Sequence, residues 1–344
     1  MITSRDRVIR TLCHEPIDRA PRDLWITPAM ELLHADDVAE MQRRYPNDLI
    51  RPEFRRPRGQ RAKGAAHEAG QYTDAWGCTW QVAERGARAT LVHSPLGGAD
   101  QVASYRPPME TLDKASFAAV NRGCSATSRF VLGPSDVRVL QRIEWLCGAD
   151  AALADLRSPG KPIRDLLAML HDFSCREISL WASTEVDGVE FADALGSPQG
   201  LAVSPQVFRD LLKPLYREYC TILHEKDKFA FFRTEGAIEP IFGDLVEIGV
   251  DAIHANLFAT NLEALAERFR NRVTFWGDLD HDRVLRSSTP EDVKSAVRRV
   301  RSALDYGRGG LIAQCQWSPE VPFRNITAAM EQWLAPMPMH AQVN

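Results

Sequence analysis

The 344-residue sequence lacks several patterns that would place it in a familiar class of protein. No apolar stretch approaches the roughly 18–20 residues that span a bilayer. Residues 2–6 lack the apolar core of a signal peptide. The seven cysteines show no CxxC spacing, which indicates free thiols in a reducing compartment and no short zinc motif. We therefore expect a cytoplasmic protein that does not contact a membrane.

Neither sign of charge is in large excess. The formal net charge of -4 argues against nucleic acid as the main partner. One segment departs from this average, because residues 51–63 (RPEFRRPRGQRAK) are rich in arginine. A charge run of this kind is typical of a solvated loop, and the alternative is a contact for an anionic ligand or an acidic partner. The pattern favours the loop.

The sequence does contain short apolar strands that alternate with amphipathic helices. The predicted strands are residues 23–26, 130–133, 185–191, 229–234, 252–257, 273–277 and 311–314. The predicted helices are residues 4–13, 161–172, 238–248, 262–269, 290–304 and 325–334, with a further helix that begins after Ser204 and is kinked or restarted at Pro214.

This alternation predicts an α/β protein with a parallel sheet. No GxGxxG follows the first strand, so the pattern favours a closed (β/α)8 barrel over a dinucleotide-binding sheet. Residues 71–81 and 90–93 predict a β-hairpin insertion, and the chain begins with a helix. With no internal repeat and no linker, we expect a single domain over residues 1–337 and a flexible tail over 338–344.

Polar side chains follow the carboxyl ends of these apolar strands, where the active sites of such barrels lie. They are Asp193, Arg233, Glu235, His254, Asn256, Asp278, Asp280, His281, Cys315, Gln316 and Trp317. Because a buried charge is costly unless it is paired, their concentration at one pole predicts a catalytic site.

Each of these residues also has a structural interpretation. Arg233 and Glu235 share a strand face with Phe231, and they could form a structural ion pair. His254 could be a hydrogen-bonded core histidine, Cys315 a small buried residue, and Asp278 the cap of a turn. Oxygen, nitrogen and sulfur donors from Glu235, His254 and Cys315 form a candidate zinc set that leaves an open position.

Several motifs resemble the uroporphyrinogen decarboxylase superfamily, and more narrowly its branch of corrinoid-dependent methyltransferases. They are TSRDRVIRTLCHEPIDRAPRDLW, YTDAWGCTW, DGVEFADALGSPQGLAVSPQVFRDLLKP, FFRTEGAIEPIFGDLVEIGVDAIHA, VTFWGDLD and PEVPFRNI, in that order over nearly the whole chain. The resemblance implies a distorted (β/α)8 barrel.

Two departures from the family pattern bear on the chemistry. Residues 25–30 read WITPAM where the decarboxylases carry the arginines that grip their substrate, which disfavours decarboxylation. The His-x-Cys of the zinc-dependent methyltransferases falls on Arg233 and Glu235, and their second cysteine falls on Cys315. Arginine cannot coordinate a metal. The alternatives are zinc on Glu235, His254 and Cys315, or a metal-free acid/base or anion-orienting pair of Arg233 and Glu235.

The resemblance thus implies a methyltransferase that moves a methyl group from a small methylated substrate to a corrinoid (cobalamin) held by a partner protein. Glu235 or a neighbouring zinc ion would assist the leaving group, Arg233 would hold an anionic substituent, and His254 and Asp278 would orient the leaving atom. The other expected substrate contacts are Asp193, Trp76, Trp317, Asn256, Gln316 and His281. A lyase acting on a small carboxylated substrate and a non-catalytic small-molecule-binding barrel stay open, as do a monomer and a homodimer.

Overall fold

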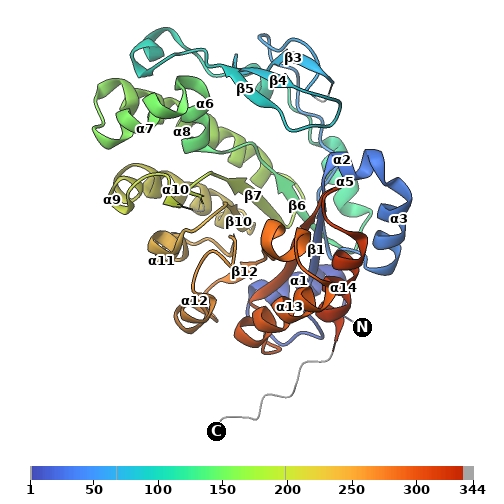
Figure 1. Cartoon of the computed structure of the whole chain (residues 1–344). Coiled ribbons are helices and arrows are strands. Elements are labelled where there is room, and N and C mark those ends of the chain that lie inside the picture. Colours follow the sequence, from blue (N-terminus) through green and yellow to red (C-terminus); the bar gives the residue numbers. More distant parts are fainter. Residues whose placement is uncertain (1, 67, 198, 336–344) are drawn as a thin grey trace.

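Eight parallel strands form one sheet that nearly closes on itself as a barrel (Figure 1). The computed structural model describes residues 2–66, 68–197 and 199–335. The barrel strands are β1 (Arg22–Ile26), β2 (Leu49–Ile50), β6 (Phe130–Pro134), β7 (Gly188–Ala192), β10 (Phe229–Arg233), β11 (Ala252–His254), β12 (Thr274–Trp276) and β13 (Leu311–Trp317). The predicted (β/α)8 barrel is confirmed, and the tail predicted at 338–344 lies outside the described residues.

Helices cover the outside of this barrel, and in Figure 1 they follow the colour order of the chain around it. They are α1 (Ser4–Leu12), α2 (Pro28–Leu33), α3 (Ala35–Arg44), α4 (Glu110–Asp113), α5 (Ala118–Ser125), α6 (Val139–Cys147), α7 (Ala149–Arg157), α8 (Lys161–Ala182), α9 (Pro205–Val207), α10 (Lys213–His224), α11 (Glu239–Glu247), α12 (Leu262–Phe269), α13 (Pro290–Leu304) and α14 (Phe323–Leu334). Among the described helices, none combines the length and apolar character needed to cross a membrane.

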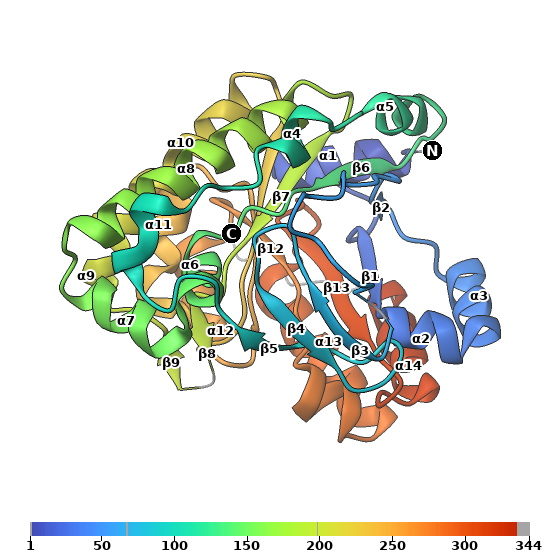
Figure 2. The ribbon, with the colours of Figure 1, turned by 90° about the horizontal axis from the view of Figure 1, so that it is seen from above.

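The chain between β2 and β6 adds a three-stranded antiparallel sheet, made of β3 (Gly70–Thr73), β4 (Thr79–Val82) and β5 (Thr90–His93). The predicted insertion is therefore confirmed. Residues 71–81, predicted as one segment of the hairpin, form most of two strands, β3 and β4, which pair with each other. Figure 2 shows this sheet in front of the barrel strands. Asp74 fixes the β3–β4 turn, because its carboxylate accepts hydrogen bonds from Trp76 N (2.9 Å), Cys78 N (3.0 Å) and the Trp80 indole (2.9 Å).

The barrel strands bury a different set of side chains on each face. Leu49, Phe231, Ala252 and Ile312 belong to a small apolar cluster inside the barrel, while the intervening residues pack outward against the helices. Helix α1 adds Val8 and Leu12 to this inner cluster and so closes the amino ends of the strands.

Charged and polar side chains occupy the next inward positions along the same strands. Successive residues point to opposite faces, so the position two residues after each apolar one also faces inward. These positions are Arg51, Arg233, His254 and Gln314. The barrel interior is therefore apolar toward the amino ends of the strands and polar toward the carboxyl ends.

The contact between β1 and β2 differs from the other strand contacts, because these strands are the two ends of the sheet order. The segments are joined by a backbone hydrogen bond from Asp48 N to Arg22 O (2.9 Å). The Asn47 side chain bridges the remaining gap, since it accepts from Leu24 N and donates to Leu24 O, both at 2.9 Å. We call this contact the β1–β2 seam.

Candidate functional site at the carboxyl end of the barrel

Four side chains form a row of alternating charge across the barrel interior. Arg51 donates to Asp23 Oδ1 (2.9 Å) and Oδ2 (3.2 Å) and to Glu190 Oε2 (3.4 Å). Glu190 Oε1 in turn accepts from Arg233 Nε at 2.8 Å. The expected pairing of Arg233 with Glu235 is wrong, because Arg233 turns inward to β7 while Glu235 lies beyond the strand end.

Trp25 from β1 lies at the centre of this row. Its ring stacks on His254 with centroids 4.6 Å apart, and the guanidinium carbons of Arg51 and Arg233 lie 5.5 and 5.4 Å from its centroid. The indole N–H groups of Trp25 and Trp276 both donate to Asp23 Oδ2, at 2.7 and 2.9 Å. Cations over an aromatic face are attracted by its quadrupole, so Trp25 holds both arginines in place.

His254 is held as a neutral imidazole with its lone pair on Nε2. Its Nδ1 lies 3.1 Å from the Thr234 carbonyl oxygen, which can only accept, so Nδ1 carries the hydrogen. Burial lowers the pKa of His254 to about 4. Nε2 has no hydrogen-bond partner among the described residues. A buried, unpaired acceptor of this kind is suited to receive a hydrogen bond from a ligand.

A cavity of about 490 Å³ opens beside His254, a size that suits a small organic ligand. Its lining includes six of the strand-end residues predicted from the sequence: Glu235, His254, Asn256, Asp278, Asp280 and His281. We call it the acidic cavity, because Asp282 also lines it.

A second cavity adjoins the first and shares Thr234 and Glu235 with it. Its lining includes Arg88, Arg138 and Arg233, so we call it the arginine cavity. The acidic cavity is thus richer in carboxylates and the arginine cavity in guanidinium groups.

Asp278 is the carboxyl group with the most perturbed proton affinity in the acidic cavity. Burial raises its pKa well above the usual range, and the negative charges of Asp280 and Glu235 raise it further. Its Oδ1 has no hydrogen-bond partner within the part of the chain that the structure describes. Asp280 is different, because it accepts from Asn256 Nδ2 (3.0 Å) and from the backbone of residues 282 and 283. Asp278 therefore keeps its proton at a pH where an ordinary aspartate is ionised.

Gly236 explains why a glycine follows the charged end of β10. Its φ is +69°, and a Cβ there would lie 2.4 Å from Ser197 N in the neighbouring loop. Only glycine satisfies both constraints, so Glu235 is held at the junction of the two cavities.

Replacing Gly236 with alanine should lower the free energy of unfolding by about 1–3 kcal/mol from backbone strain, with an added loss from the clash. Gly307→Ala is the matched control, because Gly307 has a φ of +77° and a Cβ there would meet no atom within 4 Å. Urea unfolding of both variants separates the two contributions. Equal losses in the two variants would show that the contact with Ser197 is unimportant.

Several other predicted site residues lie elsewhere or have structural partners. Asp193 lines the arginine cavity but is buried, and it accepts from the backbone N–H groups of Leu140 and Gln141 and from the Tyr216 hydroxyl (2.6 Å). Its carboxylate therefore caps α6 and anchors α10, and its role as a substrate contact stays a prediction. His281 lines the acidic cavity with Nε2 2.9 Å from Ser318 Oγ.

The predicted tryptophan walls are wrong. Trp76 sits in the β3–β4 turn, where its ring packs against Phe173 and the Arg142 guanidinium. Trp317 is fully buried and donates its indole N–H to Val321 O at 3.0 Å. Neither lines the acidic or the arginine cavity, and neither does the half-buried Gln316.

The side chains at this end of the barrel do not fit the zinc site that the resemblance implies. Ile312 faces the barrel interior, so Cys315, three residues later, faces outward into the helix layer with Leu24. The predicted set of Glu235, His254 and Cys315 does not converge, and we derive no step through a metal there.

Asp23, Trp25, Arg51, Glu190 and Gln314 are site residues that sequence reasoning missed. Each lies within a strand or directly after a two-residue strand. The signal that could have found them is the two-residue alternation of side chains along a strand. Glu190 is a polar residue within an otherwise apolar strand, and Arg51 lies two positions after Leu49, on the same face.

Comparison with known proteins gives a family and a fold. A family model described as uroporphyrinogen decarboxylase (URO-D) matches residues 146–333, more than half of the chain. A methyltransferase from Methanosarcina mazei superposes with a TM-score of 0.73 at 14% identity, covering 97% of this chain and 98% of that one. A glycosylated endo-beta-1,4-xylanase from Gloeophyllum trabeum superposes with a TM-score of 0.48 at 11% sequence identity, covering 97% of this chain and 99% of that one. No curated protein sequence matches the chain. At 14% identity, the likeness to the Methanosarcina protein shows the barrel fold alone.

Proposed function

The chain belongs to the uroporphyrinogen decarboxylase family, and on this premise we propose that it is a demethylating methyltransferase. It moves a methyl group from a small methylated substrate that carries an anionic substituent to a corrinoid held by a partner protein. A reduced corrinoid supplies the nucleophile that takes the methyl group, and the residues of this chain bind the substrate and manage its proton.

The observation that carries the proposal is the presence of a neutral acid and a neutral imidazole in one cavity. Asp278 keeps its proton because of burial and two neighbouring carboxylates, and His254, which lines the same cavity, carries a buried lone pair on Nε2 that has no partner among the described residues. When a methyl group leaves an oxygen or nitrogen atom as a cation equivalent, that atom gains negative charge and needs a proton. Asp278 donates this proton, and His254 Nε2, which can only accept, then takes a hydrogen bond from the new O–H or N–H group of the product.

The arginine cavity supplies the substrate orientation in this proposal. Arg233 uses Nε for Glu190, and its two terminal nitrogens make no hydrogen bond within the described part of the chain. Those nitrogens, with Arg88 and Arg138, suit a carboxylate or another anion. Glu235 is exposed at the junction of the two cavities, and it returns a proton from solvent to Asp278 after the transfer.

The test is a panel of methylated compounds, each with and without a carboxylate, incubated with cob(I)alamin or with candidate corrinoid proteins. We expect the absorbance of the methylated corrinoid to appear with a carboxylate-bearing compound. If no compound reacts with any corrinoid protein, the proposal is wrong. The three arginines also suit a substrate that loses its carboxylate, so release of carbon dioxide without corrinoid would instead support a lyase.

Arg233→Gln should raise the KM for the carboxylate-bearing substrate by about 10- to 100-fold, the effect of losing a hydrogen bond between charged groups. The matched control is the analogue without the carboxylate, whose KM should be unchanged in the same variant. A similar increase for both compounds would mean that Arg233 supports the barrel end through Glu190 and does not contact the substrate.

A further inference from the structure

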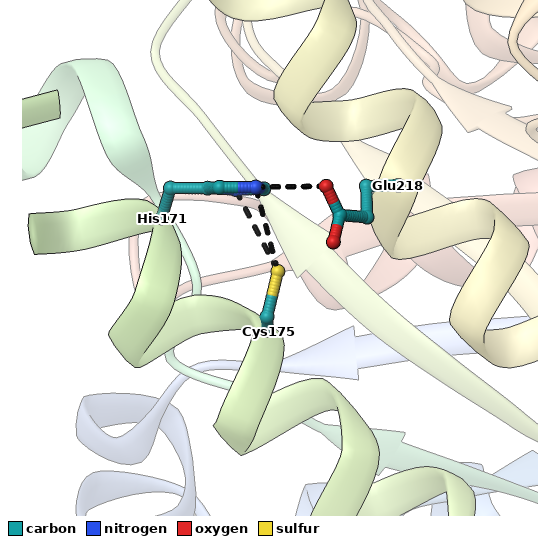
Figure 3. A group of neighbouring side chains, drawn as sticks. All are labelled: His171, Cys175 and Glu218. Atoms are coloured by element: carbon teal, nitrogen blue, oxygen red, sulfur yellow. Dashed lines mark hydrogen bonds and ion pairs between the residues drawn. The ribbon is translucent and has the colours of Figure 1, made fainter. Parts of the chain in front are cut away.

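We propose that His171, Cys175 and Glu218 form a binding site for a divalent transition metal, with zinc as the best match. The group lies on the outer helix layer, between α8 and α10, and is separate from the barrel end (Figure 3). Within the described residues it is the group of three His, Cys, Asp or Glu side chains whose donor atoms all lie within 4.8 Å of one another.

Two helices supply the three donor atoms. His171 and Cys175 are four residues apart on α8, so they lie on one face, one turn apart. Glu218 reaches the same point from α10, as Figure 3 shows. Donors held on two packed helices are better fixed in position than donors on loops.

The separations between the donor atoms agree with shared coordination. Zinc bond lengths of about 2.3 Å to sulfur and about 2.0–2.1 Å to nitrogen or oxygen, at tetrahedral angles, place sulfur about 3.5 Å from nitrogen. Cys175 Sγ lies 3.7 Å from His171 Nε2 and 3.6 Å from Nδ1, so its side chain turns toward the Nε2 side when the sulfur and Nε2 share an ion. The same geometry places nitrogen about 3.3 Å from oxygen, and His171 Nε2 lies 2.9 Å from Glu218 Oε2. The Glu218 side chain is 56% exposed and can adjust to this small difference.

The second ring nitrogen of His171 has a partner that suits metal binding. Nδ1 lies 3.2 Å from the hydroxyl oxygen of the buried Tyr219. When that oxygen accepts the Nδ1 hydrogen, the lone pair is left on Nε2, which is the arrangement of most metal-bound histidines. Metal binding replaces the thiol proton of Cys175 with a metal–sulfur bond and releases that proton to solvent. Three protein ligands leave the fourth position open to water.

Cobalt titration tests the proposal, because a Co²⁺–thiolate bond gives a charge-transfer absorption that a histidine–carboxylate site lacks. We expect one equivalent of Co²⁺ to produce this absorption in the full-length protein, and Zn²⁺ to displace it. Cys175→Ser should abolish the absorption. Cys13→Ser, which removes an exposed cysteine outside the site, should leave it unchanged.

Zinc should also stabilise the folded protein, raising the Tm by about 4 °C at a concentration about 100 times the Kd. Cys175→Ser should lose this shift, while Glu235→Gln in the acidic cavity should keep it. Absence of the thiolate absorption in the unsubstituted protein, or its persistence in Cys175→Ser, would overturn the site and show that His171 and Glu218 form an ion pair only.

Discussion

Replacing Asp23 with alanine is expected to lower the free energy of unfolding by about 3–5 kcal/mol, the cost of removing one partner of a buried ion pair. The Asp23 side chain is fully buried and accepts four hydrogen bonds, two from Arg51 and one from each of the Trp25 and Trp276 indoles. Its removal leaves two indole N–H groups without an acceptor and leaves Arg51 with only its longer contact to Glu190. Urea unfolding measures the loss.

Asp23→Asn is the control that separates charge from shape. The amide keeps the size of the side chain and one acceptor oxygen, so we expect a smaller loss than in Asp23→Ala, of about 1–3 kcal/mol. The two indole N–H groups can share that oxygen, while Arg51 loses its closest countercharge. A loss below about 1 kcal/mol in the alanine variant would contradict the view that these hydrogen bonds hold the barrel end together.

Asp278→Asn should reduce kcat by about 10²- to 10⁴-fold, the usual contribution of a positioned general acid. The same substitution should increase stability at neutral pH. In the folded protein Asp278 binds its proton more tightly than in the unfolded chain, because its folded pKa is raised. Folding stability therefore falls as the pH rises from about 3.9, the ordinary aspartate value, to the folded pKa.

The amide introduced by Asp278→Asn does not titrate, so this variant should lack the pH dependence, which is at most about 1.4 kcal/mol per pH unit. Unfolding measured at several pH values checks the stability, and the corrinoid assay checks the rate. Asp278→Glu keeps an acid and should retain part of the activity. Full activity in Asp278→Asn would exclude Asp278 as the proton donor and leave Glu235 as the candidate.

Local sequence patterns predicted most of the barrel. Helix α12 spans the predicted residues 262–269, the Thr289 capping box at the start of α13 is confirmed, and α10 restarts next to Pro214 after a short π-helical segment, residues 208–212. These features depend on hydrogen bonds and steric effects between residues close in sequence. Strand β2 has only two residues, which is too short to produce a periodic signal, and it was missed.

The candidate site was predicted only in part, because its most important contacts join distant parts of the chain. Arg51 and Asp23 come from different strands, and so do Arg233 and Glu190. The preferred interpretation of residues 51–63 as a solvated loop is wrong for Arg51 and for Arg56, which pairs with the buried Glu177. Cys315 stands between Gln314 and Gln316 in the last strand, and its outward direction became clear only from the strand pairing.

The β1–β2 seam limits how this barrel can diverge. A ladder of backbone hydrogen bonds persists whatever side chains the strands carry, whereas here the Asn47 amide and the Asp23–Arg51 pair help to join the first and second strands. Substitutions at these residues that altered ligand binding would also weaken the contact that closes the barrel. In this chain, substitutions that alter ligand binding without disturbing the seam are therefore expected on the opposite wall, in the loops that follow β10, β11 and β12.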